Sequence, residues 1–158
     1  MSLTINTTIN GKAVSAGAEA STSLLEFLRD TLSFKGTKLC CNTGECGACT
    51  IIYNGKPINS CVTMAADAIG ADIITIEGLA DGDKLHPVQQ AFIDTGAVQC
   101  GYCTPGYIMS VKALFDRTKK PTAEDIEEAV SGNICRCTGY TKIVDAIQLA
   151  ADRMAGRS

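Results

Sequence analysis

Cysteine is the residue type with which this sequence could do chemistry, and most of its cysteines fall into closely spaced groups. The sequence holds nine cysteines but only one histidine. The first group reads Cys41-x4-Cys46-x2-Cys49, and Cys61 follows further along the chain. This is the plant-type ligand spacing of a [2Fe–2S] cluster. Because thiolates are soft ligands that suit iron–sulfur chemistry, the group predicts one such cluster.

A structural zinc site is the alternative for this first group. Zinc sites usually pair two C-x2-C motifs, whereas here only Cys46 and Cys49 form one. Gly44 and Gly47 lie between the candidate ligands, where glycine permits positive φ and lets amide N–H groups point at cluster sulfurs. Cys40 is left over because it would make a C-x5-C spacing; we expect a buried or half-buried small residue, with an alternative ligand or a redox sensor as its other roles.

The second group consists of two short motifs, Cys100-x2-Cys103 and Cys135-x1-Cys137. The first motif stands just before a predicted helix with Pro105 near its first position. Helix N-termini supply partial positive charge and free N–H groups, which suit an anionic cluster. A C-x2-C motif alone also fits zinc or dithiol redox chemistry, whereas C-x1-C is unusual for tetrahedral zinc. The spacing therefore favours a second [2Fe–2S] cluster, with zinc as the alternative.

Strand patterns dominate the first half of the chain, which must position the first cysteine group. Asn-Gly pairs at residues 10–11 and 54–55 predict two hairpins, and Ser21 or Ser23 can cap a helix between them. Residues 36–49 have no periodicity and are expected to form a loop. The predicted elements are strands at 3–9 and 12–14, a helix at 23–32, a hairpin within 50–64 and a strand at 72–77.

The pattern switches from strand-like to helix-like within residues 77–87. Thr122 is a plausible N-cap of one helix in the second half, and His86 stands before Pro87 at the N-terminus of another. The predicted helices cover residues 87–95, 105–117, 122–131 and 141–154. We therefore expect two domains, at residues 1–80 and 81–158.

Composition excludes several classes of function. With 46% hydrophobic and 20% charged residues, the chain can bury a core, and its net charge of -3 includes no basic block. We therefore expect no nucleic-acid partner and no binding to an anionic membrane. The N-terminal stretch alternates polar and apolar residues, unlike a secretory signal, and no apolar run approaches the roughly 18–20 residues of a membrane span. The expected location is the cytoplasm.

The motifs GECGACT, NSCVTM, HPVQQAF, QCGYCTPG and SGNICRCTGY occur in this order. With them the chain resembles the small iron–sulfur subunit of the molybdenum hydroxylase (xanthine dehydrogenase / aldehyde oxidoreductase) family, from about residue 3 to residue 154. The resemblance implies an α+β fold, with an N-terminal β-grasp plant-type ferredoxin-like domain followed by a C-terminal four-helix bundle. It also implies one [2Fe–2S] cluster in each domain. The implied ligands are Cys41, Cys46, Cys49 and Cys61 for the first cluster and Cys100, Cys103, Cys135 and Cys137 for the second.

The resemblance further implies that the chain is the electron-transfer subunit of an oxidoreductase, with no catalytic residue of its own. The clusters would pass electrons singly from the molybdopterin centre of a large subunit to an FAD-binding medium subunit. Gln99 and Cys137 would lie near the pterin, with Gln99 hydrogen-bonded to its edge. Glu45 and the Thr104-Pro105-Gly106 sequence are typical of the FAD-partnered branch rather than the cytochrome-linked one. The family usually has glycine at the position of Cys40, which leaves the role of Cys40 open.

The resemblance also implies a hetero-oligomer, for which a dimer of heterotrimers is one arrangement. Three other functions compete with this interpretation. One is a stand-alone two-cluster ferredoxin, against which the helical second half argues. Another is a subunit of a cytochrome-linked molybdenum dehydrogenase, and the third is a non-redox interaction module held together by zinc. The sequence does not name the organic substrate, because that would bind to another chain.

Overall fold

The computed structural model describes residues 2–156. In it, two Asn-Gly turns connect the strands of two hairpins in a mixed sheet. Asn10 and Gly11 have φ values of 52° and 75°, and Asn54 and Gly55 have φ values of 47° and 79°. Two consecutive residues with positive φ suit a tight hairpin turn. The strands are β1 (Ser2–Ile9), β2 (Lys12–Glu19), β3 (Thr50–Tyr53), β4 (Lys56–Asn59) and β5 (Asp72–Ile74). Both predicted hairpins are confirmed, although β2 is longer than the expected 12–14.

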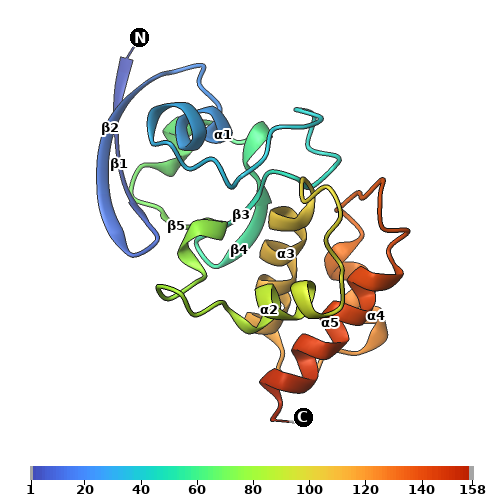
Figure 1. Ribbon diagram of the computed structural model, residues 1–158. Coiled ribbons are helices and arrows are strands. Elements are labelled where there is room, and N and C mark those ends of the chain that lie inside the picture. The colour runs from blue at the N-terminus through green and yellow to red at the C-terminus, as the bar shows by residue number, and fades with distance from the viewer. Residues whose placement is uncertain (1, 157–158) are drawn as a thin grey trace.

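The sheet has the order β2-β1-β5-β3-β4, so the last strand lies in the middle. β5 runs parallel to β1 and antiparallel to β3. One face of this sheet is covered by α1 (Leu24–Glu26) and the π-helical turn Phe27–Thr31 that continues it (Figure 1). Ser23 is the N-cap, because its hydroxyl accepts a hydrogen bond from the amide of Glu26. The arrangement is the predicted ferredoxin-like half of the α+β fold.

The predicted strand at 72–77 is too long, because β5 ends at Ile74 and a 3-10 turn covers Ile76–Gly78. The side chain of Asn10 causes the change. Its Oδ1 accepts a 2.9 Å hydrogen bond from the amide of Thr75, and its Nδ2 donates one of 3.0 Å to the Thr75 hydroxyl. The amide and hydroxyl of Thr75 therefore hydrogen-bond to a side chain instead of to the backbone of a neighbouring strand, so the hydrogen-bond ladder of β5 ends before Thr75.

Four helices make up the second half: α2 (Pro87–Asp94), α3 (Thr104–Arg117), α4 (Ala123–Val130) and α5 (Thr141–Met154). All four predicted helices are confirmed within one or two residues. His86 is the N-cap of α2, where its Nδ1 accepts a 3.3 Å hydrogen bond from the amide of Val88. Thr122 caps α4 as expected. Within residues 2–156, no helix is long and apolar enough to cross a membrane.

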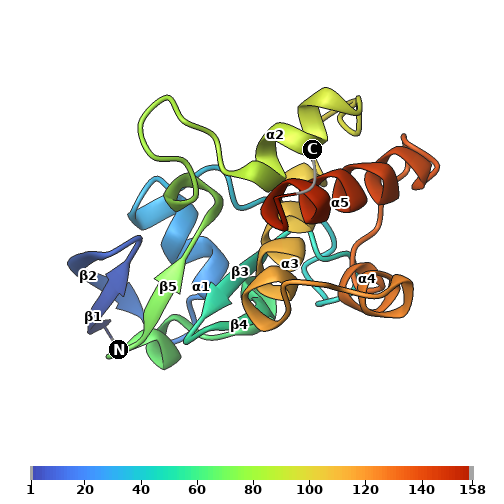
Figure 2. The ribbon, with the colours of Figure 1, turned by 90° about the horizontal axis from the view of Figure 1, so that it is seen from below.

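Helix α3 lies between the sheet and the other helices (Figures 1 and 2). On one side, Met109 and Ala113 pack against Ile52 of β3. On the other side, α3 joins the core of the helical half, which includes Val88, Phe92, Tyr107, Leu114, Ile143 and Ile147. The two halves therefore share a buried boundary. The division into residues 1–80 and 81–158 stays a prediction, and its ends at residues 1 and 157–158 lie outside the described residues.

Candidate metal centres

The loop of residues 36–49, which carries most of the first cysteine group, is closed at its base by hydrogen bonds. Arg29 Nη1 donates to the carbonyl of Lys35 at 3.0 Å and to that of Thr37 at 2.5 Å. The amide of Lys38 donates to the carbonyl of Ala48 at 3.2 Å. Because both ends of the loop are held, the residues between them can wrap around a compact centre. Arg29 is a positioning residue that the cysteine spacing does not reveal.

The loop directs backbone donors at a thiol. Gly44 and Gly47 have φ values of 81° and 68°, which turn the chain back on itself. The amides of Thr43 and Cys46 both donate to Cys41 Sγ, at 3.4 Å each. The hydroxyl of Thr43, followed by these two amides, lowers the pKa of Cys41 to about 5. The Cys41 sulfur is therefore prepared to act as an anionic ligand.

Cys49 and Cys61 form the buried side of the first group, where they pack together with Leu25. The β3–β4 hairpin brings them together, because Cys49 precedes β3 and Cys61 follows β4. Burial raises the pKa of Cys49 to about 12, and the nearby thiol of Cys61 contributes to the rise. A pair of buried thiols with this environment loses its protons when a metal neutralises the charge.

The second group gathers the two short motifs at the N-terminal ends of α3 and α5. Cys100 and Cys103 precede or cap α3, while Cys135 and Cys137 lie in the loop before α5. Burial and then the thiol of Cys135 raise the pKa of Cys103 to about 12. The thiol of Cys100 similarly raises the pKa of Cys137. The two sequence-distant motifs therefore meet as interacting pairs, Cys103 with Cys135 and Cys100 with Cys137.

Hydrogen bonds also prepare one thiol of the second group. Burial opposes ionisation of Cys135, but the hydroxyl and amide of Thr138, together with the amide of Cys137, lower its pKa to about 7. The Thr138 hydroxyl donates to Cys135 Sγ at 3.1 Å. The hydroxyl of Tyr140 accepts a 3.3 Å hydrogen bond from the amide of Cys135. Thr138, Cys137 and Tyr140 of the loop before α5 thus hydrogen-bond to Cys135 and orient it.

The donor set fits di-iron clusters. Both groups consist of thiols, the soft ligands that suit iron–sulfur chemistry. A [2Fe–2S] cluster places two thiolates on each iron, so pairs of thiols are the arrangement it needs. Such pairs are Cys49 with Cys61, Cys103 with Cys135 and Cys100 with Cys137.

The remaining predicted site residues lie at the surface. Gln99 is exposed, as are its neighbour Cys100 and the candidate pterin contact Cys137. Cys40 is exposed too, so the expectation of a buried or half-buried residue is wrong. The half-buried Cys41 accepts hydrogen bonds from amides of its own loop, whereas its predecessor Cys40 faces the solvent. The nearby thiol of Cys46 raises the pKa of Cys40.

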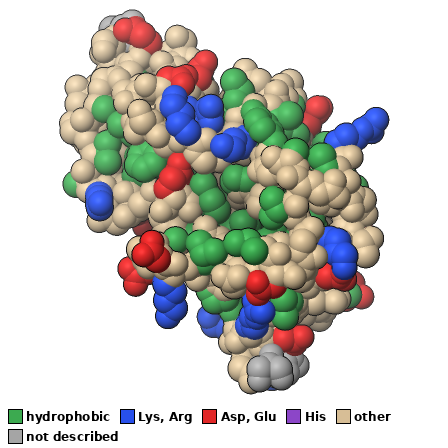
Figure 3. All heavy atoms as spheres, in the orientation of Figure 1, with side chains coloured by type: hydrophobic (Ala, Val, Ile, Leu, Met, Phe, Trp, Pro, Cys, Tyr) green, Lys and Arg blue, Asp and Glu red, His purple; other side chains and the backbone are tan. Residues whose placement is uncertain are grey.

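Hydrophobic side chains surround the two thiol groups at the surface. Exposed residues of this kind are Leu39 beside Cys40, Tyr102 between Cys100 and Cys103, and Ile134 beside Cys135. The hydroxyl of Tyr102 donates a hydrogen bond to the carbonyl of Leu39. This bond connects the segment of the second thiol group to the segment of the first. Figure 3 shows hydrophobic side chains, with cysteine coloured among them, over the end of the molecule where the 36–49 loop lies.

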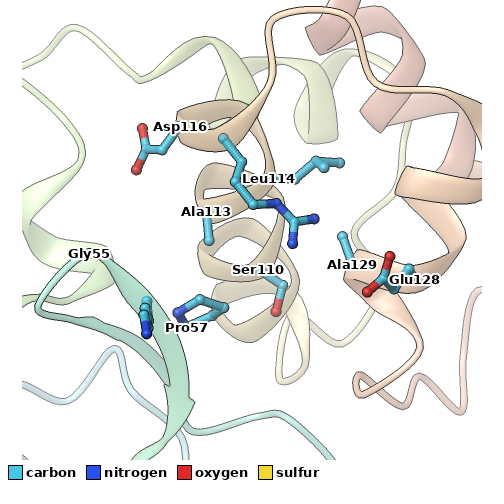
Figure 4. A pocket seen from close by; sticks show the side chains of 10 residues that line it. Gly55, Pro57, Ser110, Ala113, Leu114, Asp116, Glu128 and Ala129 are labelled. Atoms are coloured by element: carbon cyan, nitrogen blue, oxygen red, sulfur yellow. The ribbon is translucent and has the colours of Figure 1, made fainter.

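A separate cavity lies between the β3–β4 hairpin and helices α3 and α4 (Figure 4). It has a volume of about 640 Å³. Its described lining includes Lys56, Arg117, Asp116 and Glu128 but no cysteine. Charges of both signs line this cavity, so it favours no single class of ligand and takes no part in the thiol chemistry.

Both halves of the chain match families of iron–sulfur domains. A family model described as "2Fe-2S iron-sulfur cluster binding domain" matches residues 7–70. A second, described as "[2Fe-2S] binding domain", matches residues 75–148. Each match contains one of the two cysteine groups.

Full-length relatives extend the comparison. The nicotinate dehydrogenase small FeS subunit of Eubacterium barkeri is 48% identical over 153 residues, which cover 97% of this chain and 98% of that protein. The nicotine 6-hydroxylase small subunit of Paenarthrobacter nicotinovorans is 42% identical over 154 residues, covering 98% of this chain and 93% of that protein. A chain in the crystal structure of quinoline 2-oxidoreductase from Pseudomonas putida 86 superposes with a TM-score of 0.93 at 39% identity, covering 98% of this chain and 97% of that one. From its two iron–sulfur domains and these relatives, the chain belongs to the small [2Fe–2S] subunits of the molybdenum hydroxylase family.

Proposed function

We propose that this chain carries electrons from the molybdopterin centre of a large subunit, through two [2Fe–2S] clusters, to an FAD-binding medium subunit. The electron-transfer role itself follows from family membership. A [2Fe–2S] cluster, when bound, takes up and releases one electron at a time. The observation that carries the proposal is the unequal exposure of the thiols. The first group combines the buried Cys49 and Cys61 with the half-buried Cys41 and Cys46, and the second group exposes Cys100 and Cys137 at the surface.

The proposed ligands are eight of the nine cysteines, all except Cys40. Cys41, Cys46, Cys49 and Cys61 would hold the first cluster, and Cys100, Cys103, Cys135 and Cys137 the second. Hydrogen bonds from backbone amides and threonine hydroxyls to Cys41 and Cys135 support the assignment. Such donors stabilise negative charge on sulfur, so they favour the reduced form of a bound cluster.

The second group is the proposed contact with the large subunit. Cys100 and Cys137 are both exposed, so a partner can approach their sulfur atoms directly. Gln99 is exposed next to them, and its amide can donate to and accept from the edge of a pterin. The exposed side chains of Tyr102 and Ile134 supply apolar surface of the kind found in the core of subunit interfaces.

The acceptor side is proposed to be a flavin subunit. Glu45 is exposed in the first cysteine loop, and Thr104-Pro105-Gly106 opens α3. Both features are typical of the FAD-partnered branch. We further propose a cytoplasmic hetero-oligomer, for which a dimer of heterotrimers is one arrangement. A stand-alone ferredoxin is not favoured, since the similar proteins are named as subunits of a dehydrogenase and a hydroxylase. Glu45 and the Thr104-Pro105-Gly106 sequence are what argue against a cytochrome-linked subunit.

Purification of the native complex under anaerobic conditions tests the proposal. We expect iron and acid-labile sulfide to co-elute with molybdenum, a pterin and FAD at a mass far above the 16.6 kDa of this chain. Haem in place of FAD would contradict the proposed flavin acceptor but not the electron-transfer role of this chain. Iron that elutes mainly at the mass of the free chain would contradict the subunit role, and zinc without sulfide would contradict the clusters.

A further inference from the structure

The two thiol groups meet through a backbone contact that the cysteine motifs do not predict. The amide of Ile134 donates a 3.0 Å hydrogen bond to the carbonyl of Cys46. Cys46 is a proposed ligand of the first cluster, and Ile134 directly precedes Cys135, a proposed ligand of the second. One hydrogen bond therefore joins residues from the two ligand sets, although they lie far apart in the sequence.

A buried side chain reinforces this contact. Asn133 is 5% exposed, and its Nδ2 donates a 3.0 Å hydrogen bond to the carbonyl of Gly47. The same carbonyl accepts from the hydroxyl of Thr50 at 2.7 Å. The carbonyl of Asn133 in turn accepts a 2.5 Å hydrogen bond from the hydroxyl of Tyr107 in α3. Asn133 thus connects the first cysteine loop, the loop before α5 and helix α3.

The backbones meet so closely that side chains are excluded on both sides. A Cβ atom at Gly106 would lie 2.1 Å from the carbonyl oxygen of Gly47 and 3.1 Å from the Cα of Ala48. A Cβ atom at Gly47 would lie 2.3 Å from the carbonyl oxygen of Gly132. These are backbone atoms, which cannot rotate out of the way. The absence of a side chain at Gly106 therefore sets the separation between α3 and the first cysteine loop.

We propose that Asn133 and Gly106 are positioning residues that set the separation of the two clusters. They hold the Cys46–Gly47 peptide against the segment that leads into Cys135. The hydrogen bond from Ile134 to Cys46 joins the two ligand sets. When one electron passes from one cluster to the other, no bond forms or breaks. The inference rests on the proposed function, because it needs two reducible clusters.

Gly106→Ala in the assembled complex tests the inference, with Gly132→Ala as the matched control. A Cβ atom at Gly132 has no heavy atom within 4 Å, so this variant leaves the contact intact. Alanine is the better helix former by about 1 kcal/mol, so at Gly106 only the contact penalises it. The measurement is the magnetic interaction between the two reduced clusters, seen as splitting of their EPR signals at low temperature. We expect part of this splitting to be lost in Gly106→Ala and none in Gly132→Ala.

Asn133→Ala provides a second, milder variant, because Thr50 still satisfies the carbonyl of Gly47. It too should lose splitting while both cluster signals keep their intensity. Unchanged splitting in both variants, with both clusters present at full iron content, would overturn the inference and leave the proposed function standing. Absence of two distinct cluster signals in the unmodified complex would instead contradict the proposed function.

Discussion

The hydroxyl of Tyr107 donates a 2.5 Å hydrogen bond to the carbonyl of Asn133 in the interior of the helical half. Tyr107 is fully buried in α3, one turn after Cys103, and Asn133 lies two residues before Cys135. Burial raises the pKa of Tyr107, so its hydroxyl stays protonated and remains a donor. This bond fixes the loop that carries Cys135 and Cys137 to helix α3, which follows Cys100 and Cys103.

Tyr107→Phe should therefore destabilise the protein by about 1–3 kcal/mol, since it leaves the buried carbonyl of Asn133 without its donor. The measurement is the free energy of unfolding from urea titration of the cluster-loaded protein. Tyr53→Phe is the matched control, because the Tyr53 hydroxyl donates to the carbonyl of Asp67 at an exposed position where water can replace it. Equal losses in the two variants would contradict the structural importance given to the buried bond.

Cys135→Ser and Cys61→Ser should each remove one cluster and leave the other. Each serine replaces one thiol of a single group, and the groups lie in different halves of the fold. We expect each variant to keep about half of the iron and acid-labile sulfide, because each cluster holds two of each. EPR of the reduced protein should show a different signal missing in each case. Loss of both signals in a folded single variant would mean that the cysteines are divided wrongly.

Cys40→Gly should leave both cluster signals intact, since Cys40 is exposed and its neighbour Cys41 receives the hydrogen bonds that favour a ligand. Iron content and EPR intensity of the first cluster are the measurements. Cys41→Gly is the corresponding positive control and should remove the first signal. If Cys40→Gly removes it while Cys41→Gly does not, the ligand assignment is one residue off.

His86 should make stability depend on pH in the range where histidine titrates. Burial lowers its pKa from the ordinary value of 6.5, with the positive charge of Lys112 adding to the effect and Asp116 opposing it. The folded protein therefore favours neutral His86, whose Nδ1 accepts the hydrogen bond that caps α2. The unfolded chain binds the proton more readily, so stability is fully present above pH 6.5 and decreases as the pH falls below it.

His86→Asn isolates this effect, because asparagine is also a good N-cap but does not titrate. Unfolding midpoints of both proteins are compared across the range from about pH 5.5 to pH 8, around the unperturbed histidine pKa. The difference between them should be largest at the high-pH end, where neutral His86 contributes most. His86 is the only histidine in the sequence. Parallel profiles for the two proteins would contradict the prediction.

Local patterns were sufficient to predict most elements of the fold. Asn-Gly pairs specify tight hairpins, and helix caps such as Ser23 and Thr122 depend on residues three positions away. The errors occurred where distant residues decide the outcome. Asn10, which follows the neighbouring strand β1 but is distant in the sequence, ends β5, and the direction in which the Cys40–Cys41 segment faces depends on how the whole loop turns.

By itself, the sequence predicted which atoms are suited to bind iron, because the thiol spacing within each short motif is a local property. It also determined the two-part architecture, since hydrophobic periodicity is local too. Only the tertiary structure decided how the two thiol groups face each other. Gly106, Asn133 and the Cys46–Ile134 hydrogen bond connect segments that are distant in the chain. Their effect depends on close packing of backbones, which exists only once both halves have folded against α3.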